Sequence, residues 1–164
     1  KGIFIRLKCY PFSPGVAQMP DYSFPKSYRL RRRKDFERIF AEKCRASDEW
    51  IVVYGGANDL GHPRLGICAS AKIGSAVYRN RWKRLIREAF RLSKGDLPSG
   101  LDLVVIPQRS YFPTLRTLQK SLWRLARKLK EKVQKHNARR ERETRSAKAG
   151  PQKSRPPAPK NDRS

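Results

Sequence analysis

Acidic residues and histidines are scarce in this 164-residue sequence, which has 14 Asp and Glu, against 39 Lys and Arg, and only two histidines. A metal-free nuclease usually needs a paired general acid and base, often two histidines. A two-metal site needs clustered carboxylates. The histidines, His62 and His136, are far apart, and no D-x-D or D-x-x-E set lies on one expected strand or loop. The sequence therefore predicts no catalytic residues, no metal site and no cofactor bound by the protein alone.

Cysteines and long apolar runs are also few. Cys9, Cys44 and Cys68 are odd in number and widely spaced, which fits neither a disulfide framework nor a zinc site. We expect Cys68 to be a small buried hydrophobe and the compartment to be the reducing cytoplasm. No apolar run approaches the roughly 18 residues that a membrane-spanning helix needs, so no membrane partner is expected.

Positive charge is what the sequence has in excess, with a formal net charge of +25. Self-repulsion of this size disfavours the compact state unless a polyanion neutralises it, and the usual polyanion is nucleic acid. A solvated basic surface without a partner is the alternative interpretation, although solubility rarely demands so one-sided a balance.

The first half of the chain predicts an irregular start, one helix and two strands. Residues 1–27 contain four prolines and should be irregular. Apolar residues at helical spacing predict a helix around 36–40. The β-branched and aromatic run 50–54 and the run 65–69 read as strands, and the short connection between them predicts antiparallel neighbours.

The second half predicts two long helices around a buried strand. A helix is expected over 76–92, and the almost wholly apolar strand 101–106 should be buried on both faces. A last helix opens at 113–114 with a leucine stripe on one side. Hydrophobes vanish beyond Lys135, so 134–164 should be a disordered basic tail following a domain at 28–133.

The helix expected over 76–92 has two chemically distinct faces at about 100° per residue. One face is apolar and should pack on the sheet: Trp82, Leu85, Ile86, Ala89 and Phe90. The opposite face is polar and is called the arginine ridge here: Asn80, Arg84, Arg87 and Arg91, flanked by Arg79, Arg81 and Lys83. Arginine forks meet phosphate oxygens and stack on unpaired bases, so this face predicts RNA binding. A solvated amphipathic helix is the alternative, but only Glu88 could compensate the charge within the helix.

The run KIGSAVYRNRWKRLIREAF at 72–90 closely resembles the signature of the bacterial ribonuclease P protein component, and the resemblance extends over 28–130. It implies an α+β fold. That fold is a two-layer α/β sandwich with a central, mostly antiparallel four-stranded sheet and a left-handed βαβ crossover through the arginine-rich helix. The residues by themselves indicate three strands, so the fourth is implied by the resemblance alone. One departure is Ala71 before Lys72, where family members often have two successive basic residues.

The same resemblance implies an accessory subunit, one per RNA, whose catalytic RNA partner uses Mg²⁺ to remove the 5′ leader of precursor tRNA. The RNA-binding positions that it implies are Lys72, Arg79, Asn80, Arg81, Lys83, Arg84, Arg87 and Arg91. The 5′-leader cleft that it implies involves Arg29, Phe36, Phe40 and Tyr54. Aromatic rings stack on bases with little sequence preference. Spacing alone favours a core role for Phe36 and Phe40, and only the resemblance favours the cleft.

Two other functions compete with this interpretation. A ribosomal or general structural RNA-binding protein would share the charge and the basic tail, but it needs no leader cleft. A DNA-coating protein would need a recognition helix or a groove-entering arm with dimer symmetry, and the sequence indicates neither.

Overall fold

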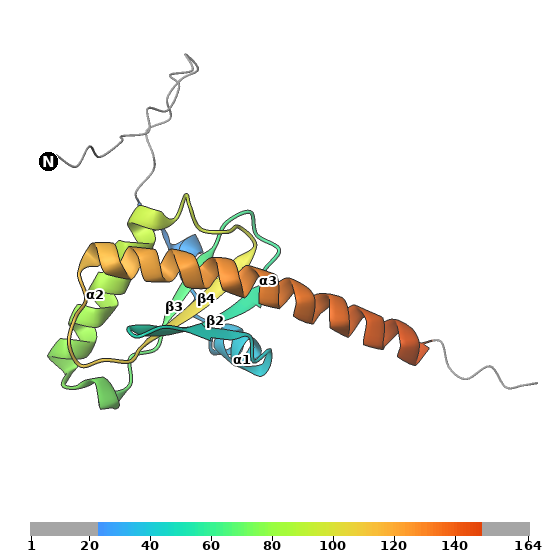
Figure 1. The fold of residues 1–164 in the computed structure, drawn as a ribbon, viewed down its shortest axis with the longest axis horizontal. Coiled ribbons are helices and arrows are strands. Elements are labelled where there is room, and N and C mark those ends of the chain that lie inside the picture. Colours follow the sequence, from blue (N-terminus) through green and yellow to red (C-terminus); the bar gives the residue numbers. More distant parts are fainter. Residues whose placement is uncertain (1–22, 149–164) are drawn as a thin grey trace, which may run out of the picture.

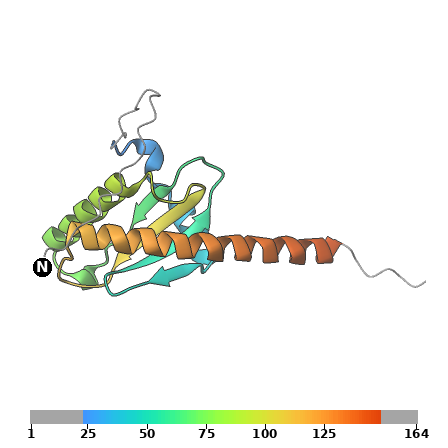
Figure 2. The same cartoon turned by 45° about the horizontal axis from the view of Figure 1, so that its top comes forward.

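The computed structural model describes residues 23–148 of the chain, with side chains described up to residue 146 (Figures 1 and 2). In chain order, the elements are η1 (Lys26–Tyr28), α1 (Arg33–Ala41), β1 (Arg45–Ser47), β2 (Ile51–Ala57), β3 (Arg64–Ile67), η2 (Ala71–Ile73), α2 (Ala76–Ser93), β4 (Leu101–Pro107) and α3 (Leu115–Lys148). The predicted irregular segment 1–27 lies mostly outside the described residues, apart from the residues leading into η1.

The four strands form one mixed sheet in the order β1-β2-β4-β3. β1 is the strand that only the resemblance implied. β2 pairs antiparallel with β1 and with β4, whereas β3 pairs parallel with β4. The sheet is therefore mostly antiparallel, as predicted. The prediction that the strands at 50–54 and 65–69, now β2 and β3, are antiparallel neighbours is wrong. β4 lies between them and is buried on both faces there.

α2 forms the crossover between the parallel strands β3 and β4. Its left-handed sense stays a prediction. The prediction for the apolar face of this helix is confirmed: Trp82, Ile86, Ala89 and Phe90 are buried, and Leu85 packs against the same core. The helix thus joins the sheet through one stripe and leaves its other side to solvent.

Helices cover both faces of the sheet, so the expected two-layer sandwich is instead three layers (Figure 1). α2 and α3 pack on one face over the main core, which includes Val53, Leu103 and Leu125. α1 covers part of the other face, where Ile39 and Val104 are fully buried. This second layer arises because strand residues alternate between faces, and both faces of β4 are apolar.

Glycines in β2 and β3 let α1 approach the sheet closely. A Cβ on Gly66 would lie 2.7 Å from the Phe36 ring, and one on Gly56 would lie 2.9 Å from Ile39. Real Cβ atoms essentially never come this close, so a side chain at either position would push α1 away. These two glycines therefore fix where the aromatic residues of α1 lie.

A buried acid joins α1 to the strands. Asp102 of β4 is fully buried, and its carboxylate accepts hydrogen bonds from Arg38 (2.5 Å), Asn58 (2.7 Å) and, in a fork, Arg64 (2.8 and 2.7 Å). A buried charge is tolerated only when it is paired and hydrogen-bonded. The arginine of α1 and the arginine of β3 supply that compensation.

α3 is longer than the sequence indicated. The prediction of a disordered tail from residue 134 is wrong for 134–148, which continue the helix to Lys148. The first half of α3 is already helical and packed on the sheet, so the second half extends an existing helix and needs no new nucleation. Residues with high helix propensity and the Arg139–Glu143 ion pair (2.7 Å) then favour its extension. The predicted tail at 149–164 lies outside the described residues.

Candidate nucleic-acid interface

The arginine ridge faces solvent. Asn80, Arg84 and Arg87 are exposed on α2, on the side opposite the buried Trp82 and Ile86. Among the flanking residues, Arg81 is exposed, and Arg79 and Lys83 are half-buried; Lys72 is exposed on η2, directly before the helix. The structure thus brings the eight predicted RNA-binding side chains onto one helix and its approach.

Aromatic contacts brace the first half of this helix. The guanidinium of Arg81 lies 4.5 Å from the centre of the Phe112 ring, which also stacks on Tyr78 with centroids 5.7 Å apart. The indole Nε1 of Trp82 donates to the carbonyl oxygen of Arg109 at 3.0 Å. Because the loop after β4 holds these groups, the ridge is presented by a rigid element.

Arg91 differs from the other ridge residues. Its guanidinium forms a two-pronged contact with the carboxylate of Glu88, at 2.9 and 2.5 Å. This hydrogen bonding lowers the pKa of Glu88 below its ordinary value of 4.5, so the acid stays ionised. The expectation of an uncompensated face therefore fails at Arg91, whose charge is partly neutralised within the helix.

A basic cavity of about 370 Å³ joins the two predicted sets of residues. Lys83 and Arg87 of α2 line one side, and Arg29 and Phe36 line the other. The remaining lining residues are Phe24, Lys26, Leu30, Arg31, Leu65 and Ile67. Sequence reasoning missed Lys26 and Arg31, whose position opposite α2 depends on the Arg29–Leu65 bridge at the β3 edge. Five cations around two phenylalanine rings suit a phosphate next to a base.

The other two cleft residues contact each other beyond this cavity. The rings of Phe40 and Tyr54 meet edge to face with centroids 5.0 Å apart, and the Phe40 side chain is 36% exposed. Phe36 and Tyr54 pack around the buried residues of the α1 face, together with Cys68. Phe36 is thus partly a core residue, as spacing favoured, whereas Phe40 presents its ring to solvent. We call Phe36, Phe40 and Tyr54 the aromatic surface.

Cys68 is half-buried, so its expected burial is only partial. Loss of solvent around the thiol raises its pKa above the ordinary value of 9.0. Lys83 nearby opposes this rise without cancelling it. Cys68 therefore behaves as a small hydrophobe beside the aromatic surface, and its thiol is uncharged at neutral pH.

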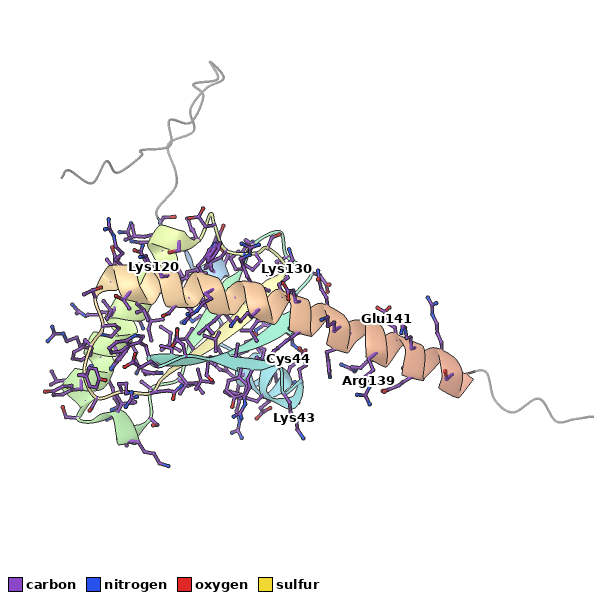
Figure 3. All side chains as sticks on the ribbon, in the orientation of Figure 1. Lys43, Cys44, Lys120, Lys130, Arg139 and Glu141 are labelled. Carbon is purple, nitrogen blue, oxygen red and sulfur yellow. The ribbon has the colours of Figure 1, made fainter. Side chains whose placement is uncertain are left out.

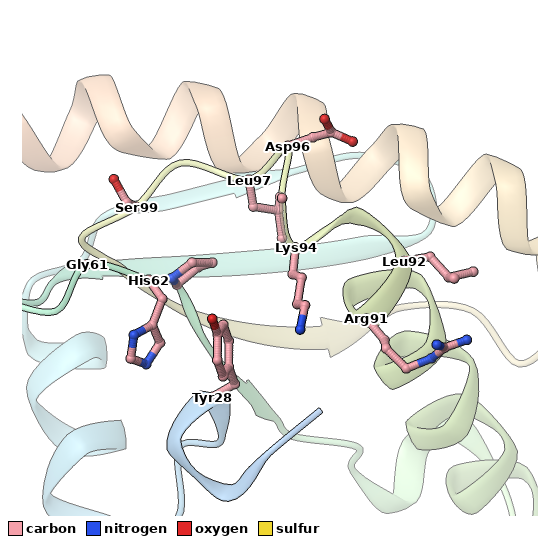
Figure 4. A pocket seen from close by; sticks show the side chains of 11 residues that line it. Tyr28, Gly61, His62, Arg91, Leu92, Lys94, Asp96, Leu97 and Ser99 are labelled. Atoms are coloured by element: carbon pink, nitrogen blue, oxygen red, sulfur yellow. The ribbon is translucent and has the colours of Figure 1, made fainter. Parts of the chain in front are cut away.

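A second cavity, of about 640 Å³, lies past the C-terminal end of α2 and was not predicted (Figure 4). Tyr28 and His62 pack there with ring centroids 4.3 Å apart, and Lys94 lies 5.2 Å from the centre of the Tyr28 ring. Arg91 and Asp96 line it as well, so cations and an acid share its wall. This mixed lining is less selective for an anion than the basic cavity.

No three His, Cys, Asp or Glu side chains within the described residues are close enough to hold a metal ion. Among the helices described, none is both long and apolar enough to cross a membrane.

A small α+β domain that sets an arginine-rich helix beside partly exposed aromatic rings is typical of a nucleic-acid-binding protein. The family model described as Ribonuclease P matches residues 24–130. The chain belongs to this family, as the resemblance of its arginine-rich segment indicated.

Relatives in the family are similar over the same region. The ribonuclease P protein component of Methylococcus capsulatus is 48% identical over 86 residues, which cover 52% of this chain and 66% of that protein. The component of Brevibacillus brevis is 37% identical over 121 residues, covering 71% and 95%. The part of α3 beyond residue 130 lies outside the family match.

Solved structures share the fold. The RNase P protein from Thermotoga maritima in complex with 1-(4-fluorophenyl)-2-thiourea matches with a TM-score of 0.55 at 40% identity, covering 60% of this chain and 96% of that one. The Staphylococcus aureus RNase P protein matches with a TM-score of 0.54 at 36% identity, covering 61% and 93%. At these identities the likeness extends beyond the fold to the sequence.

Proposed function

We propose that this chain is the protein subunit of a ribonuclease P ribonucleoprotein, with one protein bound to each catalytic RNA. In this proposal, the subunit binds that RNA and the 5′ leader of precursor tRNA and assists the endonucleolytic removal of the leader. Hydrolysis and the Mg²⁺ that it needs belong to the RNA partner in this proposal, as the resemblance to the family implies. Family membership supports the association with the RNA and the role in tRNA maturation.

The observation that carries the leader-binding part is the basic cavity. It sets Lys83 and Arg87 of the arginine ridge opposite Arg29 and Phe36. The aromatic surface continues from Phe36 along α1 to Phe40, whose ring contacts Tyr54 of β2. A single strand that leaves a folded RNA held by α2 would meet cations first and then rings, which stack on any base.

The competing function is a structural RNA-binding protein, such as a ribosomal protein. Such a protein would use the ridge to bind folded RNA, and its aromatic surface would have no role in RNA binding. The two proposals therefore differ in one property, which is whether the protein distinguishes precursor tRNA from mature tRNA.

Reconstitution of leader cleavage tests the proposed function directly. We expect the chain, mixed with a bacterial ribonuclease P RNA at low Mg²⁺ concentration, to stimulate leader cleavage of a precursor tRNA. Arg87→Ala should weaken assembly with the RNA, and Arg87→Lys is the matched control that keeps the charge but loses the fork. RNA binding without stimulation of cleavage would favour the structural RNA-binding protein.

A further inference from the structure

The far end of α3 extends beyond the sheet (Figures 1 and 2). Val133 is the last buried residue among the described side chains of the helix, and residues 138–146 are exposed, with Arg140 still interacting electrostatically with Glu42 of the domain. The helix continues to Lys148. We call residues 138–148 the distal arm. At 1.5 Å per residue, it extends roughly 16 Å from the domain.

The distal arm is basic. Its described side chains include Arg139, Arg140, Arg142 and Arg145 against Glu141 and Glu143 (Figure 3). Arg139 is paired with Glu143 at 2.7 Å. Arg142 and Arg145 form no ion pair within residues 23–146, so the arm presents cations that this part of the chain leaves uncompensated.

The arm offers little besides charge. Ala138 is the one apolar residue among its described side chains, and none of them is aromatic. A helix lying on a membrane or in a protein groove needs an apolar face. A site for single-stranded RNA usually adds stacking rings. What remains is a ligand recognised by regularly spaced negative charge.

We propose that the distal arm binds the phosphate backbone of a double-stranded RNA segment. The arm would be a second contact, separate from the arginine ridge. α2 lies against the other end of α3, since Leu92 and Ser93 share a cavity with Lys120. From Lys120 to Arg145, the helix rises roughly 38 Å. One RNA that touches both surfaces must therefore span roughly this distance.

Charge neutralisation in the assembled ribonucleoprotein tests this inference, which relies on the proposed function for the identity of the RNA. The variant replaces Arg140, Arg142 and Arg145 by Ala, which preserves helix propensity. The control replaces the same three by Lys, which keeps the charge. Affinity for ribonuclease P RNA is measured against salt, together with backbone protection by hydroxyl-radical footprinting and helicity by circular dichroism.

We expect the Ala variant to lose about 2 to 3 from the slope of log affinity against log salt, since each phosphate contact contributes about 0.9. We also expect it to lose protection of one double-stranded segment, while the Lys variant keeps both properties. An unchanged slope and footprint in the Ala variant with normal helicity would overturn the inference. Loss of protection confined to a single-stranded segment would also overturn it. Failure of the unaltered protein to bind this RNA would instead contradict the proposed function.

Discussion

Replacing Asp102 by Ala tests whether the buried carboxylate holds α1 on the sheet. The carboxylate is fully buried and accepts four hydrogen bonds, two of them from Arg64. Breaking a buried ion pair on one side costs about 3–5 kcal/mol, because the other charge is left uncompensated. The side chain of Arg64 is 20% exposed and that of Arg38 is 42% exposed, so water recovers part of this loss. We expect a destabilisation near the low end, about 3 kcal/mol.

Urea unfolding followed by tryptophan fluorescence measures this loss. With an m-value of about 1.5 kcal/mol/M, the midpoint should fall by about 2 M. Arg38→Ala is the graded comparison. It leaves Asp102 bonded to Arg64 and Asn58, so we expect a smaller loss of about 1 kcal/mol. A loss below 1 kcal/mol for Asp102→Ala, or a larger loss for Arg38→Ala, would refute the reasoning.

Three further perturbations address the ridge, the aromatic surface and the sheet. Arg84→Ala and Arg87→Ala should each reduce the salt slope of RNA binding by about 0.9; unchanged slopes would remove the ridge from the interface. Tyr54→Ala should lower affinity for precursor tRNA about tenfold and spare mature tRNA, as one lost stacking contact implies; equal losses would contradict the cleft. Burial would raise the pKa of Asp48, but hydrogen bonds from Ser121, two backbone N–H groups and Arg124 outweigh it and lower the pKa below 3.8. The stability that the carboxylate contributes is therefore present above pH 3.8 and lost as the pH falls through the folded pKa. The Asp48→Asn variant should be less stable than the unaltered protein at pH 7, and the difference between their urea midpoints should disappear in acid. A difference that does not change with pH would contradict this.

Local signals made α2 and β4 predictable. The 18 residues of α2 carry their apolar stripe and their basic face within one segment, so helical periodicity alone assigns both sides. β4 is an apolar run of strand length, and its burial on both faces follows from composition. Most of the candidate RNA-binding surface lies on α2, which explains why the ridge could be predicted residue by residue.

Strand order could not be predicted in the same way, because pairing is non-local. The short turn between β2 and β3 resembles a hairpin connection, yet each strand pairs with β4 instead. One signal was available: a strand that is apolar on both faces needs the centre of a sheet. The Asp102 cluster is equally non-local, since its partners come from positions 38, 58 and 64.

Charge pairing and helix length needed the structure as well. Glu88 compensates Arg91 but none of the exposed arginines before it, and only the side-chain geometry assigns that pairing. Composition indicated disorder after Lys135 because apolar residues end there. That reasoning treats the tail as an isolated chain, whereas residues 134–148 continue a helix that Leu125, Leu129 and Val133 already hold on the sheet.

The two halves of the candidate interface are attached to the sheet independently. Trp82 and Phe90 fix α2 to one face, whereas Asp102 and the glycine at position 66 fix α1 to the other. They meet around the basic cavity, at the β3 edge. A change that loosens α1 should therefore shift the aromatic surface and leave the arginine ridge in place. RNA assembly and leader recognition are then separable properties of one small domain, and the Asp102→Ala variant should impair the second more than the first.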